Sequence, residues 1–344
     1  MPAKNEQHSY LIKMAAEVDG FVDGLKKAAD ADLNVPVGFK QMCICGVGAS
    51  AIAGDIVADT VLTTWNVPIY VIRSTSVPNW VNEDTLVIAL SYSGNTKEAL
   101  MMYDHAEAKG CRIIVMASGG KLTDKCRRNG NELIVMPEGI QPRSAAGYMI
   151  GYLLNIIESS GGPDVNSELK DLIPVLREYR ESIWMHNAES RAQRIAEKLR
   201  GTVPVIYAVS PLSACAVRFR HQINENAKMI AFNGTVTDLD RNEINGWSGS
   251  ATICKPVLIY EEEAPETVKE AVNGTANVLR SYGSEPEVIM IDGRTSLERS
   301  LKAVMLGDYV SLFLASMNCV DPMDVSSIKS FKNALSTLLD QKGL

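Results

Sequence analysis

The chain has 344 residues, of which 46% are hydrophobic and 22% are charged, and its formal net charge is −7. These proportions are typical of folded globular proteins and argue against extensive disorder, and the length suits two domains with a core each. Acidic and basic residues are interspersed, so the sequence lacks the basic stripe that nucleic acid attracts, and we expect no nucleic-acid partner.

Two further classes are disfavoured by the sequence. No apolar run reaches the roughly 18 residues that a membrane span needs, and the N-terminal stretch lacks the basic start and apolar core of a signal peptide. The seven cysteines are odd in number and include no CxxC pair, which favours reduced thiols over disulfides or a zinc site. We therefore expect a cytoplasmic protein with no membrane partner and no metal.

The first half of the chain alternates between strand and helix patterns. A helical segment at about 8–30 precedes "QMCICGVGASAIAGDIVADTVL", where a buried strand meets a glycine turn and then a helix. Strands are predicted at 68–73, 85–90, 112–117 and 132–136, with helices around 95–109 and 121–129 between them. "PRSAAGYMIGYLLNIIES" is apolar nearly all round and predicts a buried helix that closes the domain. The alternation predicts the α/β class, with mostly parallel, doubly wound sheets flanked by helices.

"SSGGPDVNSE", residues 159–168, is the best linker candidate, so we expect domains at 1–158 and 159–344. Two helices follow, and the strand–turn–helix pattern restarts at Thr202. Further strands are predicted near 254–260 and 286–291. The halves look like a loose internal duplication.

The turn in "LSYSGNTKEAL", residues 90–100, joins a buried strand to a helix and carries three hydroxyl residues, Ser91, Ser93 and Thr96. Gly94 and Asn95 supply the tight backbone. The first turn of a helix leaves N–H groups without partners and carries the positive end of the helix dipole, so an anion is stabilised there. One residue would suffice to cap the helix, so three hydroxyls favour a cradle for one phosphate monoester.

The glycine turn "CGVGASA", residues 45–51, fits the dinucleotide fingerprint when taken alone. The next strand, however, ends in Arg73 and Ser74, where a nicotinamide enzyme would place an acidic residue for the ribose. An NADP site, in which Arg73 meets a 2′-phosphate, and a purely structural turn both remain open. The second half has no matching hydroxyl turn, because its strand "PVLIY" runs into Glu261-Glu262-Glu263, which would repel an anion.

Together "LSYSGNTKEAL" and "CGVGASA" resemble a sugar isomerase (SIS) domain. "PRSAAGYMIGYLL", "FRHQINENAKMIAF", "DLDRNEINGW" and "DYVSLFLASMNCVDPMDVSSIKSFKNAL" resemble segments of the archaeal-type bifunctional phosphoglucose/phosphomannose isomerases. This resemblance spans nearly the whole chain. It implies two SIS-type domains, a homodimer, no cofactor, and isomerisation of glucose 6-phosphate and mannose 6-phosphate to fructose 6-phosphate through an enediol.

The resemblance also implies roles for individual residues. It places the general base at Glu225 in "NENAK", an arginine beside the reacting carbons at Arg143, and another site residue at Lys332, although the neighbouring Lys329 leaves that register open. Gly48 and Ser50 would line the sugar side of the phosphate pocket. Helical spacing is compatible, because Glu225 lies nearly opposite an apolar stripe made of residues 212, 215, 216, 219, 223, 227 and 230.

Two positions depart from the family pattern. Ala49 stands where glycine is usual, and Arg241 stands where the family carries the histidine thought to open the sugar ring. A guanidinium stays protonated and cannot act as a base. His221, one helical turn before Glu225, is a candidate substitute, although it could equally be an exposed residue. A phosphosugar-binding sensor or regulator without catalysis therefore remains the leading alternative, and an NADP-binding enzyme is third.

Overall fold

The computed structural model describes residues 4–184, 190–249 and 253–341. Before residue 160 the chain forms α1 (Lys4–Asp19), α2 (Phe21–Ala29), β1 (Gln41–Cys45), α3 (Ala49–Val61), β2 (Ile69–Ile72), β3 (Thr85–Leu90), α4 (Lys97–Ala108), β4 (Arg112–Ala117), α5 (Gly120–Asn129), β5 (Glu132–Val135) and α6 (Ala146–Ser159). The helix predicted at 8–30 is thus two helices.

After residue 160 the chain forms α7 (Val165–Trp184), α8 (Arg191–Leu199), β6 (Val203–Ala208), α9 (Ser213–Ala227), β7 (Phe232–Thr235), α10 (Val236–Asp238), the π-helical turn η1 (Leu239–Glu243), α11 (Ile244–Trp247), β8 (Cys254–Glu261), α12 (Glu266–Ser281), β9 (Glu287–Ile291), α13 (Ser296–Met317) and α14 (Ser326–Gln341). The sequence patterns predicted neither β7 nor the short helical turns that follow it.

The strands form two parallel sheets, and the four strands of the second sheet repeat the order of the first four strands of the first sheet. The first sheet runs β2-β1-β3-β4-β5 and the second runs β7-β6-β8-β9, so each chain half winds outward in both directions from a central strand pair. The central strand β3 is buried along its whole length, as expected for a parallel strand covered on both faces. The predicted doubly wound α/β class and the duplication are confirmed.

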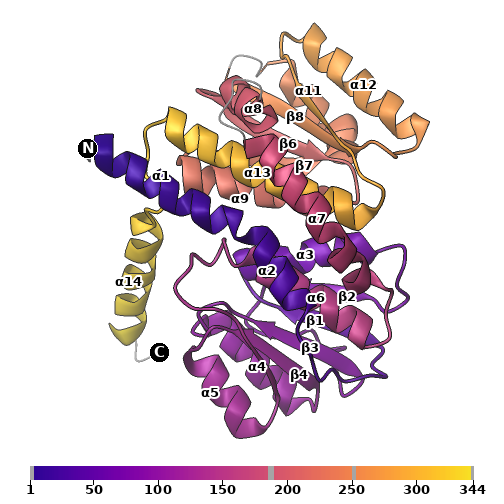
Figure 1. Ribbon diagram of the computed structural model, residues 1–344, viewed down its shortest axis with the longest axis vertical. Helices are drawn as coiled ribbons and strands as arrows, with labels where there is room; N and C mark the ends of the chain where they lie inside the picture. Colours follow the sequence, from indigo (N-terminus) through magenta and orange to yellow (C-terminus); the bar gives the residue numbers. More distant parts are fainter. Residues whose placement is uncertain (1–3, 185–189, 250–252, 342–344) are drawn as a thin grey trace.

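The two sheets enclose a shared layer of helices (Figure 1). One continuous apolar core joins the inner face of each sheet to α2, α3, α6, α7, α8, α9 and α13. A second cluster packs α4 and α5 on the outer face of the first sheet, and a third packs α11 and α12 on the outer face of the second. The molecule is therefore layered, and the inner layer is where both halves meet.

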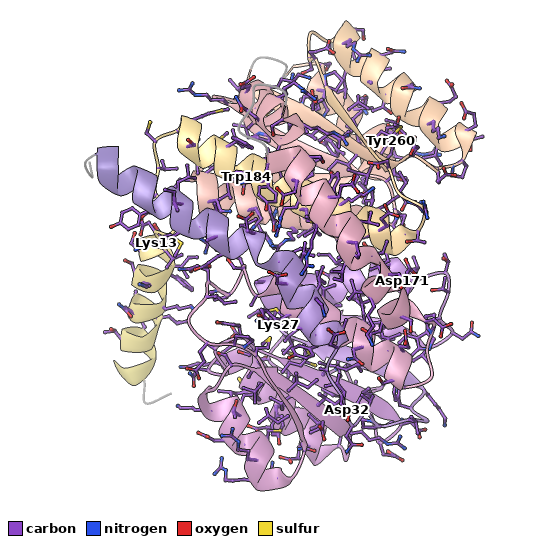
Figure 2. The ribbon with its side chains drawn as sticks, in the orientation of Figure 1. Lys13, Lys27, Asp32, Asp171, Trp184 and Tyr260 are labelled. Atoms are coloured by element: carbon purple, nitrogen blue, oxygen red, sulfur yellow. The ribbon has the colours of Figure 1, made fainter. Side chains whose placement is uncertain are left out.

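Helix α13 passes through this inner layer. By length and apolarity alone it is the one helix in the described ranges that could cross a membrane, but 83% of its most apolar window is buried inside the protein. Trp184, at the end of α7, packs on its Tyr309 and Phe313 with ring centroids 5.0 and 5.2 Å apart (Figure 2). We interpret α13 as a core helix.

The predicted linker is shorter than expected. Helix α7 already begins at Val165, and the Glu158 carboxylate accepts the backbone N–H groups of Asn166 and Ser167 at 2.7 and 2.8 Å. This is a tight helix-to-helix turn rather than a flexible connection, and the domain boundary at residue 159 stays a prediction.

Helix α14 stands apart from the layers (Figure 1). Its apolar residues Ile328, Phe331, Leu335 and Leu338 are 43%, 67%, 41% and 56% exposed. Their spacing places them on one face, which a surface helix normally buries. This face has no cover within the described part of one chain.

Candidate active site

The glycine turn and the hydroxyl turn lie side by side at one edge of the first sheet. They follow β1 and β3, which are paired neighbours, and the connections from these strands leave in opposite directions along the sheet. In open α/β sheets ligands bind at this position, outside the carboxyl ends of the strands where the order reverses. The topology therefore places both predicted turns next to each other at the point where the strand order reverses.

Gly48 is the residue of the glycine turn that requires glycine. Its φ of 59° and ψ of −129° are poorly accessible to other residues, and a β-carbon built there would meet no atom within 4 Å. The space above Gly48 is thus open to a ligand. The next residue, Ala49, already belongs to α3, so its departure from the family pattern is accommodated by ordinary helical geometry. Ser50 is buried beneath the turn.

The hydroxyl turn is preorganised by its own side chains. The Ser91 hydroxyl donates to the Thr96 hydroxyl at 2.9 Å, and the Ser93 hydroxyl accepts the Asn95 backbone N–H at 3.3 Å. Thr96 is the N-cap of α4, but its side chain accepts no hydrogen bond from that helix. The start of α4 therefore keeps backbone donors that an anion can accept from.

Gly94 and Asn95 fix the turn against the start of α5. Gly94 has a φ of 63°, and a β-carbon there would lie 1.7 Å from the Gly119 carbonyl oxygen. The Asn95 side chain accepts the Lys121 N–H at 3.1 Å and donates to the Ser93 carbonyl at 3.1 Å. Their phosphate-binding role stays a prediction, and their visible role is to hold the turn in place.

Arg143 and Glu225, predicted from different halves of the chain, lie together. Arg143 is 3% exposed, and its Nη1 lies 3.4 Å from the Glu225 carboxylate, which is 33% exposed. The guanidinium also donates to Asn226 at 2.9 Å, to Gln141 at 3.3 Å and to the Pro322 carbonyl at 2.6 Å. Burial lowers the pKa of Arg143 and the charge of Glu225 opposes this, so the guanidinium remains charged at neutral pH. A fixed cation thus faces a partly exposed carboxylate.

Helix α9 is held rigidly beneath this pair. Asn226 is fully buried, and its amide group donates to the Ser311 hydroxyl of α13 at 2.9 Å. Arg218 donates two hydrogen bonds, of 2.6 and 3.0 Å, to the Asp308 carboxylate of α13. It also donates to the Arg143 carbonyl at 3.2 Å. Asn226 and Gln141 were not predicted as site residues. The signal for Asn226 was a polar residue beside the apolar stripe of its helix.

The predicted stripe is correct as far as the end of α9 at Ala227. Ile230 lies beyond the helix and is 68% exposed, so its assignment to the buried stripe was wrong. Lys228 adopts a left-handed conformation and ends the helix there. Glu225 lines a cavity of about 750 Å³ together with Arg220, Asn224, Lys228, Ile230 and Ile328.

His221 is half-buried rather than exposed. Burial lowers its pKa to about 4, with the positive charges of Arg220, Arg218 and Arg73 acting in the same direction. Arg220 can only donate, so across their 2.6 Å contact the histidine Nε2 accepts and the ring proton lies on Nδ1. At neutral pH His221 is therefore an uncharged ring that offers an N–H donor. Its role in ring opening stays a prediction.

Arg241 and Lys332 lie outside this cluster. Both side chains are exposed, and in the described residues neither makes a hydrogen bond or ion pair with Glu225 or Arg143. Arg241 lies in η1 directly before α11, which Figure 1 places at the outer end of the second half, away from α9. One chain therefore does not bring these two residues to the predicted base.

The corresponding edge of the second sheet is occupied by the protein itself. Glu261, at the end of β8, forms a 2.8 Å ion pair with Arg299, and both side chains are nearly buried. Arg73, on which the NADP interpretation depended, is likewise paired with Asp55. The described residues contain no group of three or more His, Cys, Asp or Glu placed to hold a metal ion.

Comparison with known proteins shows which family the chain belongs to. Residues 188–335 match the family described as the bacterial phospho-glucose isomerase C-terminal SIS domain. A bifunctional phosphoglucose/phosphomannose isomerase of Aquifex aeolicus is 33% identical over 300 residues, which cover 86% of this chain and 91% of that protein. The chain belongs to the bifunctional phosphoglucose/phosphomannose isomerase family. The predicted family membership is thereby confirmed.

The chain is also similar to proteins with other descriptions. A D-glucosamine-6-phosphate 4-epimerase of Sulfolobus acidocaldarius is 33% identical over 238 residues, which cover 68% of this chain and 73% of that protein. The crystal structure of a hypothetical protein of Thermus thermophilus superposes with a TM-score of 0.75 at 16% identity, covering 97% of this chain and 95% of that one. This last likeness shows the shared fold.

Proposed function

We propose that this protein is an aldose–ketose isomerase that interconverts glucose 6-phosphate and fructose 6-phosphate. The observation that carries the proposal is the pair formed by Glu225 and Arg143, with a carboxylate 3.4 Å from a buried guanidinium. Isomerisation needs a base that moves a proton between C1 and C2, and a fixed positive charge beside the oxygen that becomes negative. The pair supplies both groups.

The proton transfers balance without an oxidant or reductant. Glu225 takes the C2 proton of the open-chain aldose, the electron pair forms the C1–C2 double bond, and the carbonyl oxygen O1 gains negative charge beside Arg143. Return of the proton from Glu225 to C1, with transfer of the O2 hydroxyl proton to O1, gives the ketose. The route moves protons only and calls for no cofactor.

The hydroxyl turn would hold the 6-phosphate. Ser91, Ser93 and Thr96 offer hydroxyl donors beside the start of α4, while Gly48 leaves open space at the neighbouring turn. Mannose 6-phosphate shares the same enediol, so we also propose it as a substrate if the pocket does not discriminate at O2.

We further propose a homodimer. The uncovered apolar face of α14 carries Lys332, which is one turn from Ile328 and from Leu335. If α14 packs on a second copy, Lys332 is carried to that copy, and Ile230 and Phe232 offer exposed apolar surface near Glu225. Phe331→Glu on this face should dissociate the dimer in sedimentation, whereas Asn333→Glu on the opposite face should not. An active monomer at assay concentration would reject an active site that is shared between the two copies.

The free cysteines are compatible with the cytoplasm, which we propose as the location of the protein.

The proposal is tested with the wild-type protein and 13C-labelled substrates. Nuclear magnetic resonance should show glucose 6-phosphate and mannose 6-phosphate converted to fructose 6-phosphate without added nucleotide. Binding of hexose phosphates without turnover would instead favour the sensor. Inversion at C4 of glucosamine 6-phosphate would favour the activity for which the Sulfolobus relative is named. A requirement for NADP would favour the third interpretation.

A further inference from the structure

The loop between β5 and α6 carries Arg143 and has few supports of its own. Residues 137–139 are exposed, and Gly139 has a φ of 87°, which marks a turn with no side chain to pack. Arg143 itself is buried at the far end of this loop. The position of the guanidinium therefore depends on the residues that hold the loop.

One support comes from within the hydroxyl turn. The Tyr92 hydroxyl donates to the Pro137 carbonyl at 2.8 Å and accepts the Ile140 N–H at 3.2 Å. Burial raises the pKa of Tyr92, so the phenol stays protonated and keeps its donor. The Tyr92 carbonyl is fixed in turn by Ser118, whose N–H and hydroxyl donate to it at 2.8 and 2.7 Å.

A second support leads from the loop to Arg143. The Gln141 N–H donates to the Glu17 carboxylate of α1 at 2.9 Å, and the Gln141 side-chain oxygen accepts from Arg143 at 3.3 Å. These hydrogen bonds thus form a continuous series that runs from the hydroxyl turn, through Tyr92 and the loop, to Arg143 and on to Glu225.

We propose that Tyr92 is a positioning residue, which sets the distance between the phosphate cradle and the Arg143–Glu225 pair. The reasoning rests on the proposed isomerase function, because a hexose 6-phosphate has its phosphate and its reacting carbons at opposite ends. A substrate held at the cradle is reactive only if the charged pair lies at the matching distance. Tyr92 belongs to the hydroxyl turn by sequence, and its hydroxyl holds the loop that leads to Arg143.

The test removes only the hydroxyl, in Tyr92→Phe. The matched control is Tyr103→Phe, which also removes a buried hydroxyl of the first half, one bonded to Asn131 at 2.8 Å and Asn129 at 3.1 Å on the outer side of the sheet. We expect kcat to fall about 10- to 100-fold in Tyr92→Phe, because displacement of about 1 Å at a site has effects of this size. The inhibition constant of inorganic phosphate should stay within about twofold, because the cradle is intact.

A second measurement does not depend on activity. Hydrogen exchange should be faster at the Ile140 amide in Tyr92→Phe than in the wild type, while Tyr103→Phe should leave that amide unchanged. Equal kcat values for the two variants, or a parallel loss of phosphate affinity and kcat in Tyr92→Phe, would overturn the positioning role. An inactive wild type would reject the isomerase function instead, and the exchange rate at Ile140 would still report whether Tyr92 holds the loop.

Discussion

Replacing Gly94 with alanine tests whether the hydroxyl turn must lie against α5. At a φ of 63° a residue with a β-carbon costs about 1–2 kcal/mol. The new atom would lie 1.7 Å from the Gly119 carbonyl oxygen, far inside the 3.0 Å that real contacts respect, so the two segments must separate. Forced repacking of this kind costs about 1–3 kcal/mol. We therefore expect Gly94→Ala to lower the free energy of unfolding by about 2–5 kcal/mol.

Gly130→Ala, directly after α5, is the matched control, because the φ of Gly130 is also positive, at 71°, but its β-carbon would meet no atom within 4 Å. The free energy of unfolding of this control should fall only by the cost of the strained backbone, about 1–3 kcal/mol. Urea unfolding measures both losses, and calorimetry with inorganic phosphate measures the cradle. Phosphate binding should be weakened in Gly94→Ala and retained in Gly130→Ala. Wild-type stability and phosphate affinity in Gly94→Ala would refute the close contact between the turn and Gly119.

Three further predictions concern the cradle, ring opening and pH. Ser93→Ala combined with Thr96→Ala should weaken hexose 6-phosphate binding by about 0.5–1.5 kcal/mol per hydrogen bond, or somewhat more to a charged oxygen, and unchanged calorimetric affinity would reject the cradle. Arg241→His should raise turnover on ring-closed glucose 6-phosphate, and His221→Ala should lower it if His221 opens the ring; unchanged or reduced turnover in Arg241→His would exclude a missing ring-opening group at that position. Burial raises the pKa of Asp59 from 3.8 to about 6, so the folded state holds this proton more tightly and the free energy of unfolding falls as pH rises from about 4 to about 6. In urea unfolding, the free energy of unfolding of Asp59→Asn should therefore rise relative to that of the wild type by up to about 3 kcal/mol between pH 4 and pH 7. If the two proteins lose or gain stability in parallel over this pH range, the prediction is wrong.

Patterns local in sequence predicted most of the elements. The run Thr85–Leu90 reads as a buried strand because a central parallel strand is apolar on both faces, and the glycines after β1 mark a turn whose geometry only glycine adopts. The strand β7 was missed because "FNGT" is short and half polar. It is a strand because it pairs with β6, and its own residues do not predict this. Ile230 was misplaced because helical spacing alone does not reveal that Lys228 ends the helix.

The sequence predicted which residues belong to the candidate site better than it predicted the contacts between them. Glu225 and Arg143 were both implied by family resemblance, but their contact joins residues 82 positions apart and depends on how α9 packs in the inner layer. The link through Tyr92 has no sequence signal, because nothing in the sequence shows that a tyrosine directly after a buried strand bonds to a loop about 45 residues further along the chain. The neutral state of His221 arises from burial and three nearby guanidinium groups, which only the folded chain brings together.

The central claim is that Glu225 moves the proton between C1 and C2, and Glu225→Gln tests it most directly. The substitution keeps the shape of the side chain and removes its basicity. In deuterium oxide the wild type should form fructose 6-phosphate that carries deuterium at C1, because the proton that Glu225 takes from C2 of glucose 6-phosphate exchanges with solvent before Glu225 returns it to C1. In Glu225→Gln both exchange and turnover should fall by about 10²- to 10⁴-fold, while phosphate affinity and the unfolding midpoint stay near the wild-type values. Near-normal exchange in Glu225→Gln would contradict the account.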